Sequence, residues 1–223
     1  ALHGRGQGPP PHHAQGQDLK RAAAAAAAGL VAAGLFAWVA ATRFPGGQSL
    51  EFCHYGEIGR QVAGGNGLRT EVLYPAEAAL LASRGADFAG PVRIVGRFPL
   101  PALLVGAAEA ALGPTDRAVL AASGGALAAA AAAAAWALSP WLGPLGALTA
   151  ALAFALSPSV VRGFALWGTP DLLFCALWLL FHEAWTRRAD ARHTGILAAL
   201  CWLARPNAVL FAPLYAVELL YNE

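Results

Sequence analysis

The sequence predicts an all-α protein, a polytopic bundle of transmembrane helices with an outer loop that carries short amphipathic helices. Hydrophobic residues make up 57% of the chain and charged residues 13%, about half of the charged share in soluble domains. Uncharged apolar runs at 22–41 and 118–138 have the length that a bilayer core requires. The net charge of +2 is too small to indicate nucleic-acid binding, so we expect a membrane as the partner.

The N-terminal residues 1–19 are rich in Gly, Pro, Gln and His, and we expect them to be a disordered cytoplasmic tail. Residues 20–223 then form one transmembrane domain. Lys20 and Arg21 precede the first predicted span, 22–41, and this run is longer than the apolar core of a signal peptide. Its basic flank should stay in the cytoplasm.

The most polar interior segment, 43–97, is predicted to be an outer loop. Tyr55, Ile58 and Val62 recur at helical spacing, which indicates a short helix lying on the membrane surface. The apolar segment 99–112 has only 14 residues and fits a re-entrant or interfacial helix better than a full span.

Further spans are expected after this segment, with a tight turn at 139–144. The positive-inside rule places the basic pairs at 20–21 and 187–188 on one side, which requires an even number of crossings between them. Four spans satisfy this rule if 99–112 does not cross, and the outer loop then shares a face with Asp171. The predicted spans are 22–41, 118–138, 145–164, 172–185 and 195–219.

Four charged residues are candidates for chemistry. Glu51 and Asp171 would lie at the outer boundary, where a partly desolvated carboxylate can act as a base or hold a divalent cation; each could instead only cap a helix. Arg205 within the last span indicates an anion or carboxylate partner, unless it reaches the cytoplasmic interface. Arg97 could bind a lipid phosphate or serve as an interfacial anchor.

The order of several short motifs resembles the GT-C glycosyltransferases, in particular the protein O-mannosyltransferase and aminoarabinose transferase group. Glu51 to Gln61, followed by the Gly65-Asn66-Gly67-Leu68 stretch, is similar to the first outer loop of that family. Later segments that match in order are Arg97 to Gly113, Arg117, Ala155 to Asp171, and Leu203 to Asn207. The resemblance covers about residues 20–220 and corresponds to the N-terminal half of the family.

This resemblance implies a membrane glycosyltransferase, or its N-terminal half, that transfers a sugar from a polyprenyl-phosphate donor to an acceptor on the outer face. It implies Glu51 as the catalytic base with Asp171 as its partner. Tyr55, Arg97 and Arg205 would bind substrate, the two arginines at the donor phosphate. The sequence departs from the family at position 51, which is usually Asp, and at Phe52, where a second acid is usual.

A non-catalytic membrane subunit that packs in a larger assembly is the alternative hypothesis. Gly124, Gly125 and the alanine run 128–135 offer a surface for close helix packing, and Phe52 in place of an acid favours this reading. Under both hypotheses the protein is expected in the cell membrane as a multi-pass protein with a cytoplasmic N-terminus.

Overall fold

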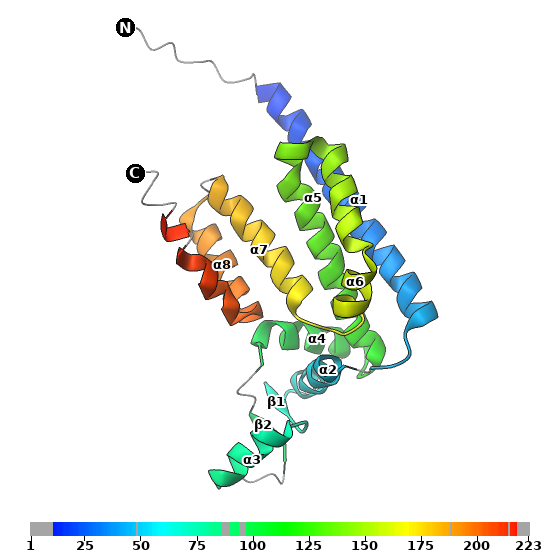
Figure 1. The fold of residues 1–223 in the computed structure, drawn as a ribbon, viewed down its shortest axis with the longest axis vertical. Helices are drawn as coiled ribbons and strands as arrows, with labels where there is room; N and C mark the ends of the chain where they lie inside the picture. The colour runs from blue at the N-terminus through cyan, green and yellow to red at the C-terminus, as the bar shows by residue number, and fades with distance from the viewer. Residues whose placement is uncertain are drawn as a thin grey trace.

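The computed structural model describes residues 11–47, 49–85, 90–93, 97–187, 189–213 and 215–217. It is mostly helical, as the sequence predicts. Long helices run side by side, and shorter ones lie across one end of them (Figure 1). In chain order the elements are α1 (Pro11–Arg43), α2 (Leu50–Ala63), β1 (Arg69–Thr70), α3 (Pro75–Ser83), β2 (Val92–Arg93), α4 (Pro99–Leu112), α5 (Asp116–Ala155), α6 (Pro158–Val160), the π-helix η1 (Val161–Ala165), α7 (Asp171–Thr186), α8 (Ala191–Ala204) and the 3₁₀-helix η2 (Pro206–Phe211).

Two helices in the described part of the chain are long and apolar enough to cross a membrane. They are Gly16–Arg43, within α1, and Asp116–Ala155. Helix α7 has 16 residues and α8 has 14, so the full polytopic bundle stays a prediction. Large apolar side chains point away from the protein on several helices: Leu30 is 74% exposed and Leu210 is 70% exposed. Such exposure is costly in water when it is extensive and favourable in lipid.

Helices α1 and α5 pack against each other in opposite directions through small residues. A side-chain carbon at Gly124 would lie only 2.5 Å from the Phe36 ring, and one at Gly29 would lie 3.2 Å from the Ala128 carbonyl oxygen. Glycine therefore allows these two helices to approach closely. The small-residue surface that the sequence suggested for an external partner is in large part covered by the chain's own α1.

Helix α1 begins at Pro11, so residues 11–19 of the predicted disordered tail are helical instead; residues 1–10 lie outside the described residues. Extending an existing helix adds one hydrogen bond for each residue ordered, which costs far less than starting a new helix. Arg21 also contacts Asp18 at 3.8 Å within this segment.

Helix α5 consists of two arms that meet at Gly143, whose φ of 69° and ψ of 165° are not helical. A positive φ at this point suits glycine, and the chain reverses there, as Figure 1 shows. The predicted turn at 139–144 is thus present. The predicted span 145–164 is interrupted, because the second arm ends at Ala155 and Pro158 starts a separate short helix.

Helices α2 and α4 lie across the end of the bundle opposite the N-terminus, which we call the α2 end (Figure 1). Ser49 caps α2 by accepting a hydrogen bond from the Phe52 N–H at 2.9 Å, and it donates one to the Trp167 carbonyl at 2.6 Å. Tyr55 and Ile58 of α2 are buried. The segment predicted as a re-entrant or interfacial helix is α4, with the expected bounds.

A small excursion between α2 and α4 contains two short strands in an otherwise helical structure. Strands β1 and β2 form a two-stranded antiparallel sheet in which Arg69 pairs with Arg93. Helix α3 lies between them in the chain and starts after Tyr74, whose N–H donates to the Glu77 carboxylate at 3.1 Å. This excursion lies within the predicted outer loop and brings Tyr74 toward α2.

The predicted span 195–219 is not one continuous helix. Helix α8 ends at Ala204, and Arg205 has an extended backbone with φ −157° and ψ 119°. Pro206 causes the break, because proline disfavours a helical conformation in the residue before it. The chain then turns back along α7 (Figure 1), where Tyr215 contacts the Phe181 ring at 5.0 Å.

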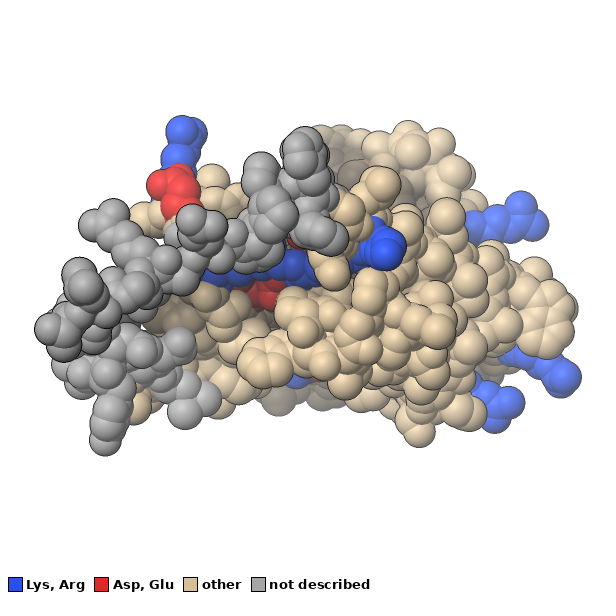
Figure 2. Space-filling view, turned by 90° about the horizontal axis from the view of Figure 1, so that it is seen from above, with Lys and Arg blue, Asp and Glu red and all other residues tan. Residues whose placement is uncertain are grey.

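The opposite end of the bundle is held by one partly buried carboxylate, that of Glu183, and we call it the Glu183 end. Arg21 donates to Glu183 at 2.6 Å and to the Trp136 carbonyl at 2.9 Å. Arg187 contacts the same carboxylate at 2.5 Å. The two basic segments predicted on one side of the membrane therefore lie at one end of the bundle. Figure 2, seen from above, shows basic side chains beside an acidic one in the middle of this face.

Candidate functional site

Arg97 is the centre of a polar cluster at the α2 end. It lies just before α4 and donates from Nη1 to Glu51 at 2.9 Å and from Nε to Nδ1 of His54 at 2.9 Å. Its Nη2 donates to the Tyr74 hydroxyl, and the guanidinium lies 4.9 Å from the centre of the Tyr74 ring. The planar guanidinium has several N–H donors in fixed directions, so it can donate to three groups at once. Arg97 therefore joins α2, the start of α3 and the start of α4.

His54 accepts the Arg97 hydrogen bond, so its Nδ1 carries no proton in this arrangement. Burial lowers the pKa of His54, and the positive charge of Arg97 lowers it further, whereas Glu77 and Glu51 act in the opposite direction. The ring also packs edge-on against Tyr74 at 4.6 Å. The neutral imidazole is a fixed acceptor that orients Arg97.

A second carboxylate–arginine pair joins α7 to the break after α8. Arg205 Nη1 lies 2.7 Å from Asp171 Oδ1, and both side chains are about two-thirds buried. Asp171 is in the first turn of α7, where the helix dipole stabilises negative charge. The extended backbone at Arg205 directs its side chain to this helix start. The Arg205 Nε is buried and has no hydrogen-bond partner among the described residues.

Tyr55 lies close to both pairs. Its side chain is 1% exposed, and its hydroxyl is buried without a hydrogen-bond partner in the described structure. Burial, and then the charge of Glu51, raises the pKa of Tyr55 to about 12; the charges of Arg97 and Arg205 act in the opposite direction. The nearby Phe98 backbone also lowers the pKa, without hydrogen-bonding geometry to the hydroxyl. Charged groups from both ion pairs, namely Glu51, Arg97 and Arg205, therefore act on the Tyr55 hydroxyl.

The five residues singled out in the sequence thus lie at one end of the molecule, but their pairing differs from the expectation. The resemblance implies that the two carboxylates act together and that both arginines serve a phosphate. In the structure each carboxylate binds one arginine: Glu51 binds Arg97, and Asp171 binds Arg205. Arg205 pairs with Asp171 at the end of the bundle opposite Lys20 and Arg21, so if that basic segment is cytoplasmic, as predicted, Arg205 would lie at the other interface.

The sequence interpretation missed two members of the cluster, His54 and Tyr74. His54 follows Glu51 by three residues and so shares its helix face, a signal that the sequence contains. Tyr74 could not be assigned, because its place depends on how the excursion between α2 and α4 folds back. Within the described ranges, no group of three or more His, Cys, Asp and Glu side chains could hold a metal ion. The divalent cation that the sequence left open therefore has no such set of ligands there.

An apolar groove of about 400 Å³ lies between α7, α8 and η2. Aromatic side chains form much of its wall, including Trp178, Phe181 and Trp202. Cys201 and Ala208, on the two sides of the Arg205 break, also line it. The groove is therefore continuous with the segment that carries Arg205.

Comparisons with known protein families, with curated proteins and with solved structures find no match to this chain. The functional argument consequently depends on the residues and their geometry.

Proposed function

We propose that this chain is a membrane glycosyltransferase, or the N-terminal half of one, that uses a polyprenyl-phosphate sugar donor. The observation that carries the proposal is the placement of two carboxylate–arginine pairs around Tyr55 at one end of an apolar helical bundle. Such a set offers bases for an acceptor hydroxyl and guanidinium groups for a phosphate. The order of motifs in the sequence favours this reaction over others that the same groups could perform.

The ion pairs are consistent with a resting state in which each arginine is neutralised by a carboxylate. A donor phosphate would compete for the N–H groups of Arg97 and Arg205, since guanidinium binds phosphate in the same bidentate geometry as carboxylate. This exchange would free Glu51 to take the proton of the acceptor hydroxyl. The acceptor oxygen then bonds to the sugar's anomeric carbon, the bond from that carbon to the phosphate oxygen breaks, and the polyprenyl phosphate leaves with the electron pair.

The apolar groove supports the lipid nature of the donor. Its walls are apolar and aromatic, and it adjoins the break that presents Arg205. A polyprenyl chain in this groove would have its phosphate near Arg205, so one molecule could use both features. The apolar side chains on the outside of α1 and η2 favour a lipid surrounding for the bundle.

The proposed orientation places the Glu183 end in the cytoplasm and the α2 end outside, in a multi-pass protein of the cell membrane. Arg21 and Arg187 gather at the Glu183 end, as the positive-inside rule requires for a cytoplasmic face. The N-terminus is then cytoplasmic, and the carboxylate–arginine pairs face the compartment where the acceptor is found.

The test uses the full chain in nanodiscs with radiolabelled polyprenyl-phosphate mannose, and it measures transfer together with slow hydrolysis of the donor by water. We expect turnover that Glu51→Gln reduces at least about 100-fold, within the range for a general base. Tyr55→Phe should reduce turnover while leaving stability nearly unchanged, because the hydroxyl it removes has no hydrogen bond to lose.

Glu71→Gln is the matched control, because Glu71 is exposed and lies outside both ion pairs. Unchanged turnover in Glu51→Gln would exclude Glu51 as the base. No turnover across a panel of polyprenyl-phosphate sugars, together with stable co-purification of another membrane protein, would instead support the non-catalytic subunit.

A further inference from the structure

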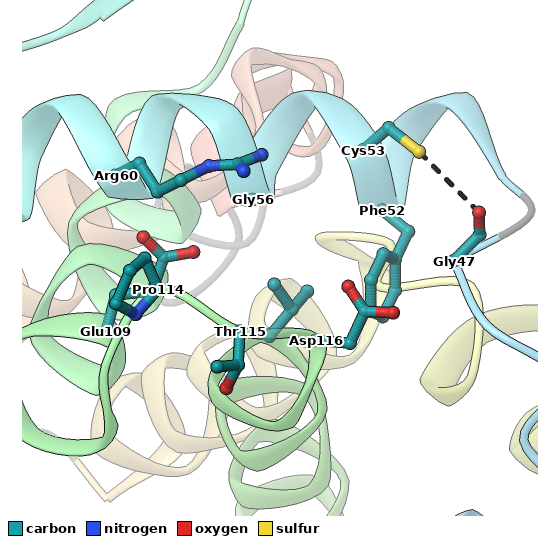
Figure 3. A pocket seen from close by; sticks show the side chains of 10 residues that line it. Gly47, Phe52, Cys53, Gly56, Arg60, Glu109, Pro114, Thr115 and Asp116 are labelled. Carbon is teal, nitrogen blue, oxygen red and sulfur yellow. Dashed lines mark hydrogen bonds between the residues drawn. The ribbon is translucent and has the colours of Figure 1, made fainter.

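A polar cavity lies between α2, α4 and the start of α5 (Figure 3). Its volume is about 160 Å³. Neither Tyr55 nor any member of the two carboxylate–arginine pairs lines it, so the cavity is separate from those pairs. We call it the Glu109 cavity; its lining residues are Gly47, Phe52, Cys53, Gly56, Arg60, Glu109, Pro114, Thr115, Asp116 and Val119.

Glu109 is the feature of this cavity that needs an explanation. Its side chain comes from α4, is 4% exposed, and lies across the cavity from Arg60, as Figure 3 shows. The Oε2 atom of Glu109 is buried and has no hydrogen-bond partner among the described residues. A buried carboxylate oxygen without a donor is costly, which indicates that a donor from outside the chain completes it.

The charges that face Glu109 do not neutralise it. Arg60 is already bound to Glu57 at 3.2 Å, and Asp116 adds a further carboxylate at the start of α5. The one arginine among the residues that line the cavity is therefore bound to Glu57, a carboxylate that does not line it. Burial, and to a lesser degree the charge of Glu57, raises the pKa of Glu109 to about 7, whereas Arg60 lowers it. What the Glu109 carboxylate lacks among the described residues is a hydrogen-bond donor to its Oε2 atom.

The size of the cavity and its hydrogen-bond acceptors select among positive ligands. In the described residues no three metal-ligating side chains of the His, Cys, Asp or Glu type come together here or elsewhere. A cavity of about 160 Å³ is larger than a bare ion needs. It has acceptors at separated points, namely the Glu109 and Asp116 carboxylates, the Thr115 hydroxyl and the Gly47 backbone. Three diverging N–H donors of an ammonium group fit such an arrangement.

We propose that the Glu109 cavity binds a small ligand through its primary ammonium group, with Glu109 and Asp116 as the acceptors. The same ammonium group occurs in free small amines and in the headgroup of phosphatidylethanolamine. Because α2 would lie at the membrane boundary, both sources can reach the cavity. The proposal does not depend on the glycosyltransferase function, since it involves a different face of α2 and no transfer step.

The experiment titrates ethanolamine into the full chain in phosphatidylcholine nanodiscs and measures binding by calorimetry at several pH values. We expect saturable binding that weakens about tenfold per pH unit below the pKa of Glu109, because only the ionised carboxylate accepts the ammonium group. Above pH 7 this dependence should disappear. Alkylation of Cys53 by N-ethylmaleimide gives a second readout, because Cys53 is exposed and lines the cavity. The bound amine should slow this reaction severalfold.

Variants separate the cavity from general charge effects. Glu109→Gln should abolish binding, and Asp116→Asn, at an exposed position, should weaken it about tenfold, as the loss of one charged hydrogen bond implies. Glu71→Gln, which removes an equal charge elsewhere, should bind as the wild type does. Should Glu109→Gln fail to fold, Asp116→Asn and the Cys53 readout still decide the question.

The source of the amine is found by repeating the Cys53 measurement in nanodiscs that contain phosphatidylethanolamine. Slow alkylation without added ethanolamine identifies the lipid headgroup, and slowing only on addition of ethanolamine identifies a free amine. Absence of binding from both sources, equal binding to Glu109→Gln, or protection by MgCl₂ but not by ethanolamine would overturn the proposal.

Discussion

Arg205 binds Asp171 at 2.7 Å and so holds the break after α8 against the first turn of α7. This contact explains how an arginine can lie in an otherwise apolar sequence. The proline that follows ends the helix, and the extended residue turns its side chain toward a carboxylate at a helix N-terminus. The break and the ion pair thus form one structural unit.

A double-mutant cycle tests this unit. Asp171→Asn and Arg205→Gln should each lower stability, and their coupling energy should be about 1 kcal/mol, as for a partly exposed ion pair. Thermal unfolding in detergent measures the four proteins of the cycle. Combining Asp171→Asn with Arg84→Gln should give additive effects, since Arg84 is exposed and distant in sequence. If the effects of Asp171→Asn and Arg205→Gln on stability are additive in the double variant, the ion pair contributes nothing to stability.

Replacement of Arg97 should have a larger effect than replacement of an exposed arginine. Arg97→Gln leaves Glu51, His54 and Tyr74 without their shared donor, and we expect a loss of about 2 kcal/mol of unfolding free energy. Arg97→Lys should restore only part of it, because a point charge cannot reach all three groups. Arg84→Gln is the control and should stay within about 0.5 kcal/mol of the wild type. If Arg97→Gln and Arg84→Gln unfold at similar temperatures, Arg97 does not have the central role proposed for it.

The crossing of α2 and α4 requires glycine at position 106. A side-chain carbon there would lie 2.5 Å from Val62 Cγ1 and 3.3 Å from the Gly59 carbonyl oxygen, so rotation of one side chain cannot relieve the clash. Gly106→Ala should therefore destabilise the protein by about 1–3 kcal/mol. Gly125→Ala is the matched control within a helix, since nothing lies within 4 Å of the added carbon. It should be neutral or stabilising by up to about 1 kcal/mol, and chemical unfolding of both variants makes the comparison.

Glu109 should give the protein a distinctive pH dependence. Its pKa is raised from 4.5 to about 7 in the folded state, so the folded protein binds more protons than the unfolded chain between these values. The contribution of Glu109 to stability should then be greatest below about pH 4.5, fall as the pH rises to about 7, and change no further above it, by up to about 3 kcal/mol in total. Glu109→Gln should remove this slope and be the more stable protein at pH 8. Unfolding free energies measured from pH 4 to 8, without added amine, test this.

The elements that the sequence predicted well are those whose boundaries are marked by proline or glycine. Pro99 and Gly113 enclose α4, Gly64 follows the end of α2, and Gly143 marks the reversal in α5. Hydropathy alone did not predict the end of a helix where the apolar residues continue beyond that end. The apolar residues on both sides of Arg205 concealed the end of α8, although the following proline is a local signal for it.

The residues of the candidate site could be selected from the sequence, but their partners could not. Glu51 and Asp171 are conspicuous as acids beside apolar helices. Which arginine each one binds depends on how the excursion between α2 and α4 and the turn after α8 fold back, and neither leaves a periodic pattern. The partnerless oxygen of Glu109 likewise arises only when α2 covers α4.

The Arg21–Glu183 contact has a consequence for how the nascent chain assembles. The two residues are 162 positions apart, so α1 and α5 leave the ribosome well before the carboxylate that neutralises Arg21 exists. Until then the guanidinium can donate to the Trp136 carbonyl of α5, and Asp18, at 3.8 Å, is the nearest carboxylate that the structure pairs with it. The contact that joins Arg21 of α1 to α7 can therefore form only after Glu183 has been synthesised.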